Sequence, residues 1–427
     1  MIPHILKQIW NKRRANAWIL IELVLVTFFM WSVIDPVYVI VSNKAIEPGY
    51  SVDNVMLLQV GEYSSTHNKY REEQNTDSAH RVSFLRIYEM VRHYQDVDAA
   101  VVTMNASYPF SESMSANSLK HDSARVSVLL MEFYEDGDFF NVFNIKEEGS
   151  GIPPTHRDLP AARNIYLTEN VVRALPRGNE QNREVHFGDT TRMYHCCGVV
   201  SNYIFRSGEQ PTPTAFIPKE KFGVKDFPYS AQICLRIRDG VSKQLFAERL
   251  KQELAPQLSI GNLYFLNLTD FHTIRKHSEF SSGITNTLRL QTGLAIFFLI
   301  CTFLGVAGTF WLRSDARKGE IGLRMSLGAS RGQILKEFLA EGWLLTTVSW
   351  LVGIFFVLQR VFYTGFAEQS QMQHLGNEDL LQNQFIPHFL IVSFVAYFLM
   401  LLITLVGTWI PASRAAKIKP AEALHDE

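Results

Sequence analysis

The chain has 427 residues, a formal net charge of −1 and a mean hydropathy of 0.00. This balance excludes a global basic field for nucleic acid, and no acidic tail is present. The apolar residues are concentrated near the N-terminus and in the last third, so the sequence indicates membrane segments around a polar middle domain.

Residues 1–16 predict an amphipathic helix on the inner leaflet, or else a basic flank without defined structure. Residues 17–41 predict the first transmembrane helix, which is apolar except for Glu22 until Asp35 and Pro36. A cleaved signal peptide is the alternative. It is disfavoured because no A-x-A site follows and the apolar run is long for such a peptide.

Residues 42–283 predict one large α+β domain outside the membrane. Two strand–helix–strand patterns occur, within residues 50–106 and within residues 226–270, and together they predict a porter-like lobe of two β-α-β units. Residues 107–225 have short alternating runs with Pro and Gly punctuation, and they predict an inserted β-rich lobe.

Three further apolar runs predict transmembrane helices at 284–312, 334–360 and 387–410. A cytoplasmic loop at 313–333 and a short external loop at 361–386 connect them. Residues 411–427 form the tail, and the last helix is expected to end at Pro411.

Orientation follows from the positions of Lys and Arg in short loops. The N-terminal segment, residues 313–333 and the tail are basic, whereas residues 361–386 contain no Lys or Arg. Both termini are therefore expected in the cytoplasm and the large domain outside it.

Catalytic signatures are absent from the sequence. It contains no G-x-x-x-x-G-K-[ST], H-E-x-x-H, paired C-x-x-C or G-x-S-x-G pattern, so it predicts no ATPase, metal or hydrolase site. The cysteines are interpreted as small packed residues. A bridge from Cys234 to Cys196 or Cys197 remains open from sequence alone.

The cytoplasmic loop reads "RKGEIGLRMSLGASRGQIL" from Arg317. Its apolar residues alternate as in a strand and also form two patches on a helix, so periodicity does not decide between them. As a helix, Ile321 and Met325 lie one turn apart on one face. A positive anchor at the membrane surface is the simplest reading of this segment.

This loop and the tail "PASRAAKIKPAEALHDE" together resemble MacB-like and FtsX-like ABC transporter permeases. The stretches "DFFNVFNIKEEGSG" and "YHCCGVVSNYIFRSGEQPTPTAF" resemble parts of that family's periplasmic core domain. The resemblance implies a dimeric inner-membrane permease with a periplasmic domain between helices one and two. It also implies a separate cytoplasmic ATPase that binds ATP and Mg, with no cofactor in this chain.

The resemblance implies a mechanotransmission subunit that moves its periplasmic domain to export or extract an antimicrobial, a peptide or a lipoprotein. The alternatives are an FtsX-like regulator of a cell-wall hydrolase and a sensor or structural membrane protein without an ATPase. The chain itself is expected to be non-catalytic. A periplasmic adaptor, an outer-membrane channel and membrane lipid are further expected partners. The residues expected to contact the ATPase are Arg317, Glu320, Ile321, Arg324 and Met325.

Overall fold

The computed structural model describes residues 13–122, 124–154, 164–175, 184–188, 193–221, 231–365 and 378–417. The chain divides into two compact units. One holds the long helices, and the other comprises Ser42–Ile284. Each unit has its own hydrophobic cores.

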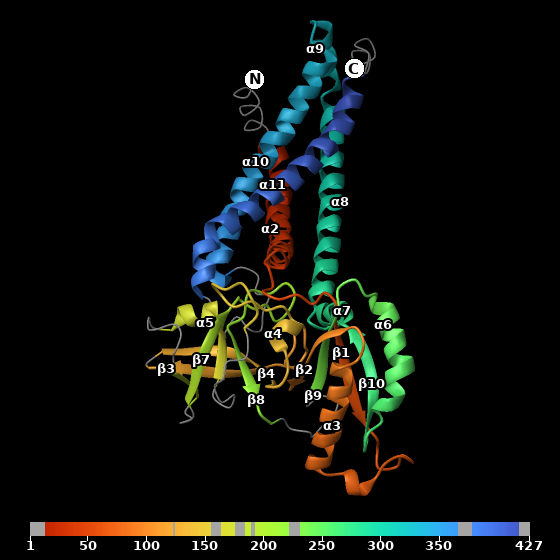
Figure 1. Ribbon diagram of the computed structural model, residues 1–427. Helices are drawn as coiled ribbons and strands as arrows, with labels where there is room; N and C mark the ends of the chain where they lie inside the picture. Colours follow the sequence, from red (N-terminus) through yellow and green to blue (C-terminus); the bar gives the residue numbers. More distant parts are fainter. Residues whose placement is uncertain are drawn as a thin grey trace. The chain divides into compact units, whose positions relative to one another are not determined.

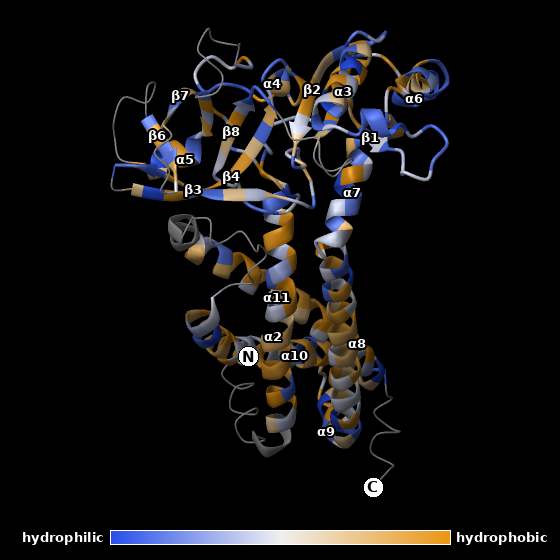
Figure 2. Cartoon of the chain, turned by 90° about the horizontal axis from the view of Figure 1, so that it is seen from below, coloured by the Kyte–Doolittle hydropathy of each residue, from blue (hydrophilic) through white to orange (hydrophobic). Residues whose placement is uncertain are grey.

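The helical unit contains four helices long and apolar enough to cross a membrane, counted over the described residues (Figures 1 and 2). They are α2 (Arg13–Lys44), α8 (Ile284–Ala316), α10 (Arg331–Thr364) and α11 (Glu378–Ala415). A short helix, α9 (Lys318–Ser326), joins α8 to α10. The four-helix part of the predicted fold class is therefore confirmed.

Small residues allow these helices to pack closely. A Cβ added at Gly353 of α10 would lie 2.7 Å from Thr27 of α2, and one at Gly342 would lie 2.9 Å from Thr408 of α11. Thr27 also donates from Oγ1 to Met400 Sδ at 3.2 Å. In lipid the hydrophobic effect does not drive helices together, so membrane helices usually associate through close packing of their backbones at small residues.

The helix ends differ from those expected from hydropathy. Helix α11 continues through Pro411 to Ala415, and α2 continues through Pro36 to Lys44. A proline removes one backbone donor but does not end a membrane helix whose neighbours satisfy the freed groups. The amphipathic helix predicted for residues 1–16 falls largely outside the described residues, as do residues 366–377 of the predicted loop and residues 418–427 of the tail. The predicted loop at 361–386 is shorter in the structure, because α10 extends to Thr364 and α11 begins at Glu378.

The first lobe of the external unit is an antiparallel sheet in the order β10-β1-β9-β2. Its strands are β1 (Val55–Glu62), β2 (Val97–Met104), β9 (Ala231–Ile237) and β10 (Leu263–Asp270). Helix α3 (Asp77–Arg92) connects β1 to β2, and α6 (Lys243–Arg249) precedes β10. This is a split β-α-β arrangement, so the two predicted β-α-β units are confirmed.

Both helices cover the same face of this sheet. Alternate residues of β1 divide between the two faces: Leu58 packs under α3 and α6, whereas Leu57 joins a core on the opposite face. Phe84 of α3 and Phe246 of α6 are fully buried against the first face. Helix α6 continues into a π turn, Leu250–Leu254, and a 3-10 turn, Ala255–Leu258.

The inserted lobe is a closed ring of six strands. Pairings run β4-β3-β6-β7-β5-β8 and return from β8 to β4. The strands are β3 (Ser115–His121), β4 (Ala124–Tyr134), β5 (Asn164–Thr168), β6 (Glu184–Phe187), β7 (Met193–Val200) and β8 (Thr214–Lys219). The β-rich prediction is confirmed, and closure into a barrel leaves these strands without a free edge.

The two lobes share a sheet and a core. Strand β2 meets β4 at the pair Thr103–Phe133, which makes one ten-stranded sheet. An aromatic cluster packs behind this junction and takes Phe139 and Phe140 from α4 (Phe139–Val142) and Phe271 from α7 (Phe271–Ser281). Cys234 lies within it as a free thiol.

A polar joint lies where the external unit begins and ends. Glu279 of α7 accepts from Lys44 Nζ at 3.0 Å, from Ser207 Oγ at 2.6 Å and from Arg275 Nε at 3.2 Å. Asn43 donates to the carbonyl of Gly208 at 3.0 Å. The segment that carries Ser207 therefore ties the exit of α2 to the helix that precedes α8.

Candidate coupling site at the α8–α9–α10 turn

The turn that contains α9 has strong local determinants. Gly328 follows α9 with φ of +99°, and Ala329 N donates to Arg324 O while Gly328 N donates to Met325 O. These two bonds close the helix in a Schellman motif, which requires the left-handed conformation that glycine adopts readily. The loop that periodicity left ambiguous is thus a helix with a defined end.

Helix α10 then begins with a capping box. Gln333 N donates to Ser330 Oγ at 3.3 Å, and Ser330 N donates to Gln333 Oε1 at 2.8 Å. The two motifs fix the short connection between α9 and α10, because each satisfies donors or acceptors that a helix end leaves free. A displacement of α9 would therefore be passed to the start of α10.

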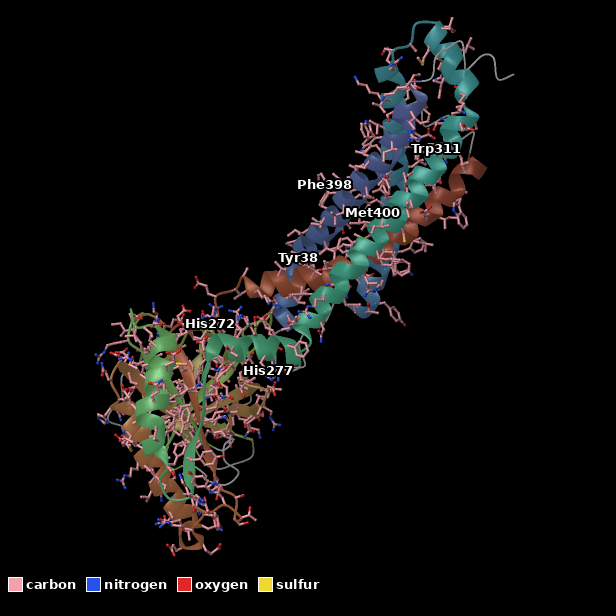
Figure 3. The ribbon with its side chains drawn as sticks, turned by 90° about the vertical axis from the view of Figure 1, so that its right-hand side faces the viewer. Tyr38, His272, His277, Trp311, Phe398 and Met400 are labelled. Carbon is pink, nitrogen blue, oxygen red and sulfur yellow. The ribbon has the colours of Figure 1, made fainter. Side chains whose placement is uncertain are left out.

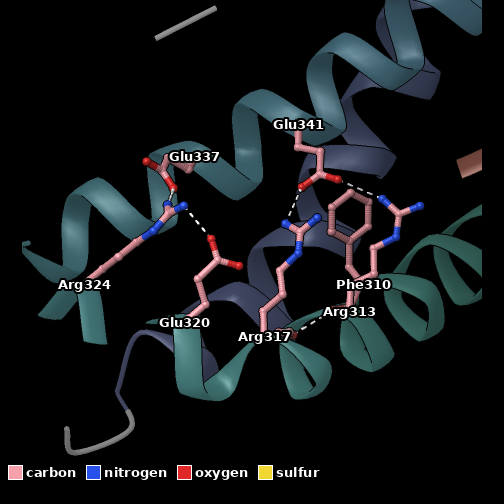
Figure 4. Close-up of polar contacts among 8 residues, drawn as sticks. Phe310, Arg313, Arg317, Glu320, Arg324, Glu337 and Glu341 are labelled. Carbon is pink, nitrogen blue, oxygen red and sulfur yellow. Dashed lines mark hydrogen bonds and ion pairs between the residues drawn. The ribbon is translucent and has the colours of Figure 1, made fainter. Parts of the chain in front are cut away.

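Glu341 of α10 ties this helix to α8 (Figure 4). Its two carboxylate oxygens accept from Arg313 Nη1 at 2.9 Å and from Arg317 Nη1 at 3.1 Å. The side chain of Glu341 is 6% exposed, and those of the two arginines are 12% and 14% exposed. Arg313 also lies over the ring of Phe310. A carboxylate this buried is stabilised only while its cations remain in place.

A second ion pair network lies one turn further out. Arg324 of α9 donates from Nη1 to Glu337 Oε2 at 2.8 Å and from Nη2 to Glu320. These side chains are a third exposed or more, so each pair contributes less than the pairs of Glu341. The network nevertheless links α9 to α10 independently of the backbone turn.

The residues expected to contact an ATPase fall into two groups. Ile321 is buried in the helical core, and Met325 packs half-buried against the same core. Glu320, Arg324 and Arg317 are held by partners within the chain. The ATPase contact of these five residues stays a prediction.

The outward face of α9 carries two apolar residues that were not among the predicted ATPase contacts. Leu323 is 53% exposed and Leu327 is 80% exposed, and they lie one turn apart. Their inward neighbours Ile321 and Met325 occupy the opposite side of the helix. The helical period, once the segment is known to be a helix, separates these two sets of residues.

Two polar sites were missed at the level of sequence. The first is the pairing of Glu341 with Arg313, neither of which was among the predicted site residues, although an acid at the edge of a membrane segment is itself a signal. The second is Asp35 of α2, which accepts from His388 Nε2 of α11 at 2.7 Å. A pairing across more than three hundred residues has no local signature.

Fold and site together define a membrane protein with four apolar helices and a large domain between the first two. Residues 292–420 match the family described as FtsX-like permease C-terminal. The Bacillus subtilis protein described as uncharacterized ABC transporter permease YknZ is 32% identical over 343 residues, covering 78% of this chain and 72% of that protein. The chain therefore belongs to the ABC transporter permeases with an FtsX-like domain.

Other relatives match over shorter stretches. The macrolide export ATP-binding/permease protein MacB of Bradyrhizobium diazoefficiens is 30% identical over 201 residues, which span 46% of this chain but only 27% of that protein. The crystal structure of the periplasmic region of MacB from Actinobacillus actinomycetemcomitans has a TM-score of 0.33 and 15% identity. The match covers 54% of this chain and 94% of the MacB periplasmic chain.

Proposed function

We propose that this permease is the membrane subunit of a mechanotransmission machine that is driven by a separate cytoplasmic ATPase. The observation that carries the proposal is the outward pair Leu323 and Leu327 on a helix held rigidly between α8 and α10. Two exposed leucines at helical spacing fit a hydrophobic groove in a partner. Polar groups around them, including Glu320 and Arg324, form the rim.

Movement would pass from α9 through its inward contacts. Ile321 and Met325 pack on the helical core, and Glu341 holds α8 against α10 through Arg313 and Arg317. We therefore assign Arg317, Ile321 and Met325 to transmission and Leu323 with Leu327 to docking. Glu320 and Arg324 form the rim of the docking surface and also link α9 to α10. Because α8 follows directly from the external unit, a displacement of α8 would move that unit.

The remaining parts of the proposal follow from the family. ATP and Mg would bind the partner ATPase, and this chain would be a non-catalytic subunit in the inner membrane with its termini in the cytoplasm. A second permease copy or paralogue would complete the membrane part, with a periplasmic adaptor and outer-membrane channel as further partners. The cargo would be a periplasmic antimicrobial, peptide or lipoprotein.

The docking helix is tested by paired substitutions and capture of the ATPase on purified permease. Leu323→Asp with Leu327→Asp is expected to weaken ATPase binding at least about tenfold, since burying a leucine contributes about 1.5–3 kcal/mol. The thermal unfolding of the permease should stay unchanged, because both side chains are exposed.

Ile321→Asp with Met325→Asp is the matched pair on the opposite face. It is expected to lower the thermal stability of the helical unit as well as the coupling, because a buried carboxylate would enter the core. Full ATPase binding by the Leu323 and Leu327 variant would refute the docking assignment. If neither pair affects binding, α9 is not the contact.

A further inference from the structure

An ion pair inside the helical unit has no role in the site described above. His388 of α11 donates from Nε2 to Asp35 Oδ1 of α2 at 2.7 Å. The side chain of Asp35 is 2% exposed and that of His388 is 12% exposed. Burying an ionisable group within a membrane helix costs free energy, so such groups usually have a function.

The pair lies in an apolar and aromatic setting. The ring of Tyr38 is 4.7 Å from that of His388 (Tyr38 is labelled in Figure 3), and Trp31 and Phe389 belong to the same cluster. A leucine and a valine at these two positions would suit such apolar surroundings without any ionisable group. The same surroundings strengthen a hydrogen bond between charged groups because little water screens it.

Three helices meet at this level through polar contacts. Arg360 of α10 donates from Nη1 to Ser32 Oγ of α2 at 2.9 Å, one turn from Asp35. Trp31 Nε1 of α2 donates to Ser393 Oγ of α11 at 3.2 Å. Among the described contacts, the other titratable groups at this level are Tyr38 of α2 and Arg360 of α10. The arginine keeps its charge at every accessible pH, whereas histidine is the side-chain type whose ordinary charge change falls nearest to neutrality.

Each member of the pair also stands beside a proline within its helix, Pro36 in α2 and Pro387 in α11. A proline removes one backbone hydrogen bond, so a helix bends at that level at a lower cost than elsewhere. The only described side-chain ion pair between α2 and α11 therefore lies at the level where both helices bend at the lowest cost.

We propose that Asp35 and His388 are positioning residues that hold α2 against α11, and that protonation of the imidazole tightens this contact. The neutral ring already donates a hydrogen bond to an ionised carboxylate, and protonation of the ring adds the attraction between two full charges. Any consequence of this contact for transport rests on the proposed function, in which α2 connects the membrane part to the external unit. The contact itself needs no partner.

The contact is measured on the full chain in lipid nanodiscs, with Cys301→Ser removing the exposed native thiol. Spin labels at Val41→Cys on α2 and Ile386→Cys on α11, both exposed positions, report the separation of the two helices. Between about pH 8 and about pH 5.5, which bracket the ordinary histidine range, the ratio of close to separated pairs is expected to rise roughly fivefold.

Three variants separate positioning from mere packing. His388→Gln retains an amide donor but cannot titrate, so it should fold and lose the pH dependence. Asp35→Asn should favour the separated pairs at both pH values, and exchange of the two residues, Asp35→His with His388→Asp, should restore the pH dependence. His277→Gln, at an exposed histidine of the external unit, should behave as the parent chain.

A distance distribution that does not change with pH in the parent chain would overturn the inference. So would His388→Gln with the parent's pH dependence. A second measurement, the pH profile of ATP hydrolysis by the assembled complex, separates this inference from the proposed function. If the distance responds to His388 and hydrolysis does not, the positioning pair stands and the coupling of α2 to the ATPase fails.

Discussion

Glu341 illustrates how a single residue can control the geometry of a site. Its carboxylate is nearly enclosed and is shared by Arg313 of α8 and Arg317 beyond the end of that helix. Both arginine side chains are also largely buried, so the three charged groups are stable only together. This arrangement makes the ends of α8 and α10 move as one body.

Glu341→Gln is expected to lower the stability of the helical unit by about 3 kcal/mol, because two buried guanidinium groups lose their counter-charge. Thermal unfolding in nanodiscs measures this loss. Glu337→Gln serves as the control: its partner Arg324 is partly exposed, so the expected loss is below about 1 kcal/mol. Equal effects of the two substitutions would contradict the proposed clamp.

Glu209 is a second buried acid, in the segment that forms the polar joint. It is 6% exposed, and its Oε2 has no hydrogen-bond partner among the described residues. Burial raises the pKa of Glu209 to about 7, and Arg206 lowers it by a smaller amount. The folded state therefore binds more protons than the unfolded chain between the ordinary value of 4.5 and about 7.

The stability of this segment should accordingly fall as the pH rises through that window, and stay low above it. Glu209→Gln should remove the dependence and stabilise the protein above pH 7 by about 1–3 kcal/mol. Hydrogen exchange of residues 201–213 as a function of pH measures the effect. A parent chain whose exchange protection increases from pH 5 to 7 would show that the sign is wrong.

At the scale of elements, the turn between α9 and α10 has two nearby glycines in different backbone conformations. Gly328 has a φ of +99°, whereas Gly332 lies within α10. A Cβ at either position would meet nothing within 4 Å. Any difference between them therefore comes from the backbone alone.

Gly328→Ala is expected to cost about 1–2 kcal/mol, because an L-residue resists the left-handed conformation. Gly332→Ala should be neutral or stabilise α10 by up to about 1 kcal/mol. Amide exchange across α9 and the first turn of α10 would show the loss of protection in the first variant only. A loss of equal size in both would mean that the Schellman motif does not hold the turn.

The elements also show what sequence can and cannot predict. Membrane helices and the two β-α-β units were predictable because their signals are local: long apolar runs and a change from period two to period 3.6. The closed ring β3–β8 was not, because the pairing of β4 with β8 depends on register between distant strands. The inward and outward faces of α9 required knowledge that it is a helix, and the pair Asp35–His388 required the packing of α2 on α11.

For the whole molecule, orientation in the membrane is the property with the sharpest test. Asn68 is exposed in the external unit and Ser326 is exposed at the end of α9, so cysteines at both positions are accessible to water. In a Cys301→Ser background, an impermeant thiol reagent added outside spheroplasts should label Asn68→Cys and not Ser326→Cys. Permeabilised cells should show labelling of both. Labelling of Ser326→Cys alone in intact spheroplasts would reverse the orientation.

The strand order of the external unit also governs its biogenesis. Strand β1 leaves the membrane first, yet Val55 pairs with Arg236 and Met56 with Asp270, which emerge last. The ring β3–β8 lies wholly between them and can close while synthesis continues. A chain that has been exported only as far as residue 225 should thus carry a protease-resistant ring and a protease-sensitive β1. Until residue 270 is exported, β1 has no pairing partner, and export chaperones would have to protect it.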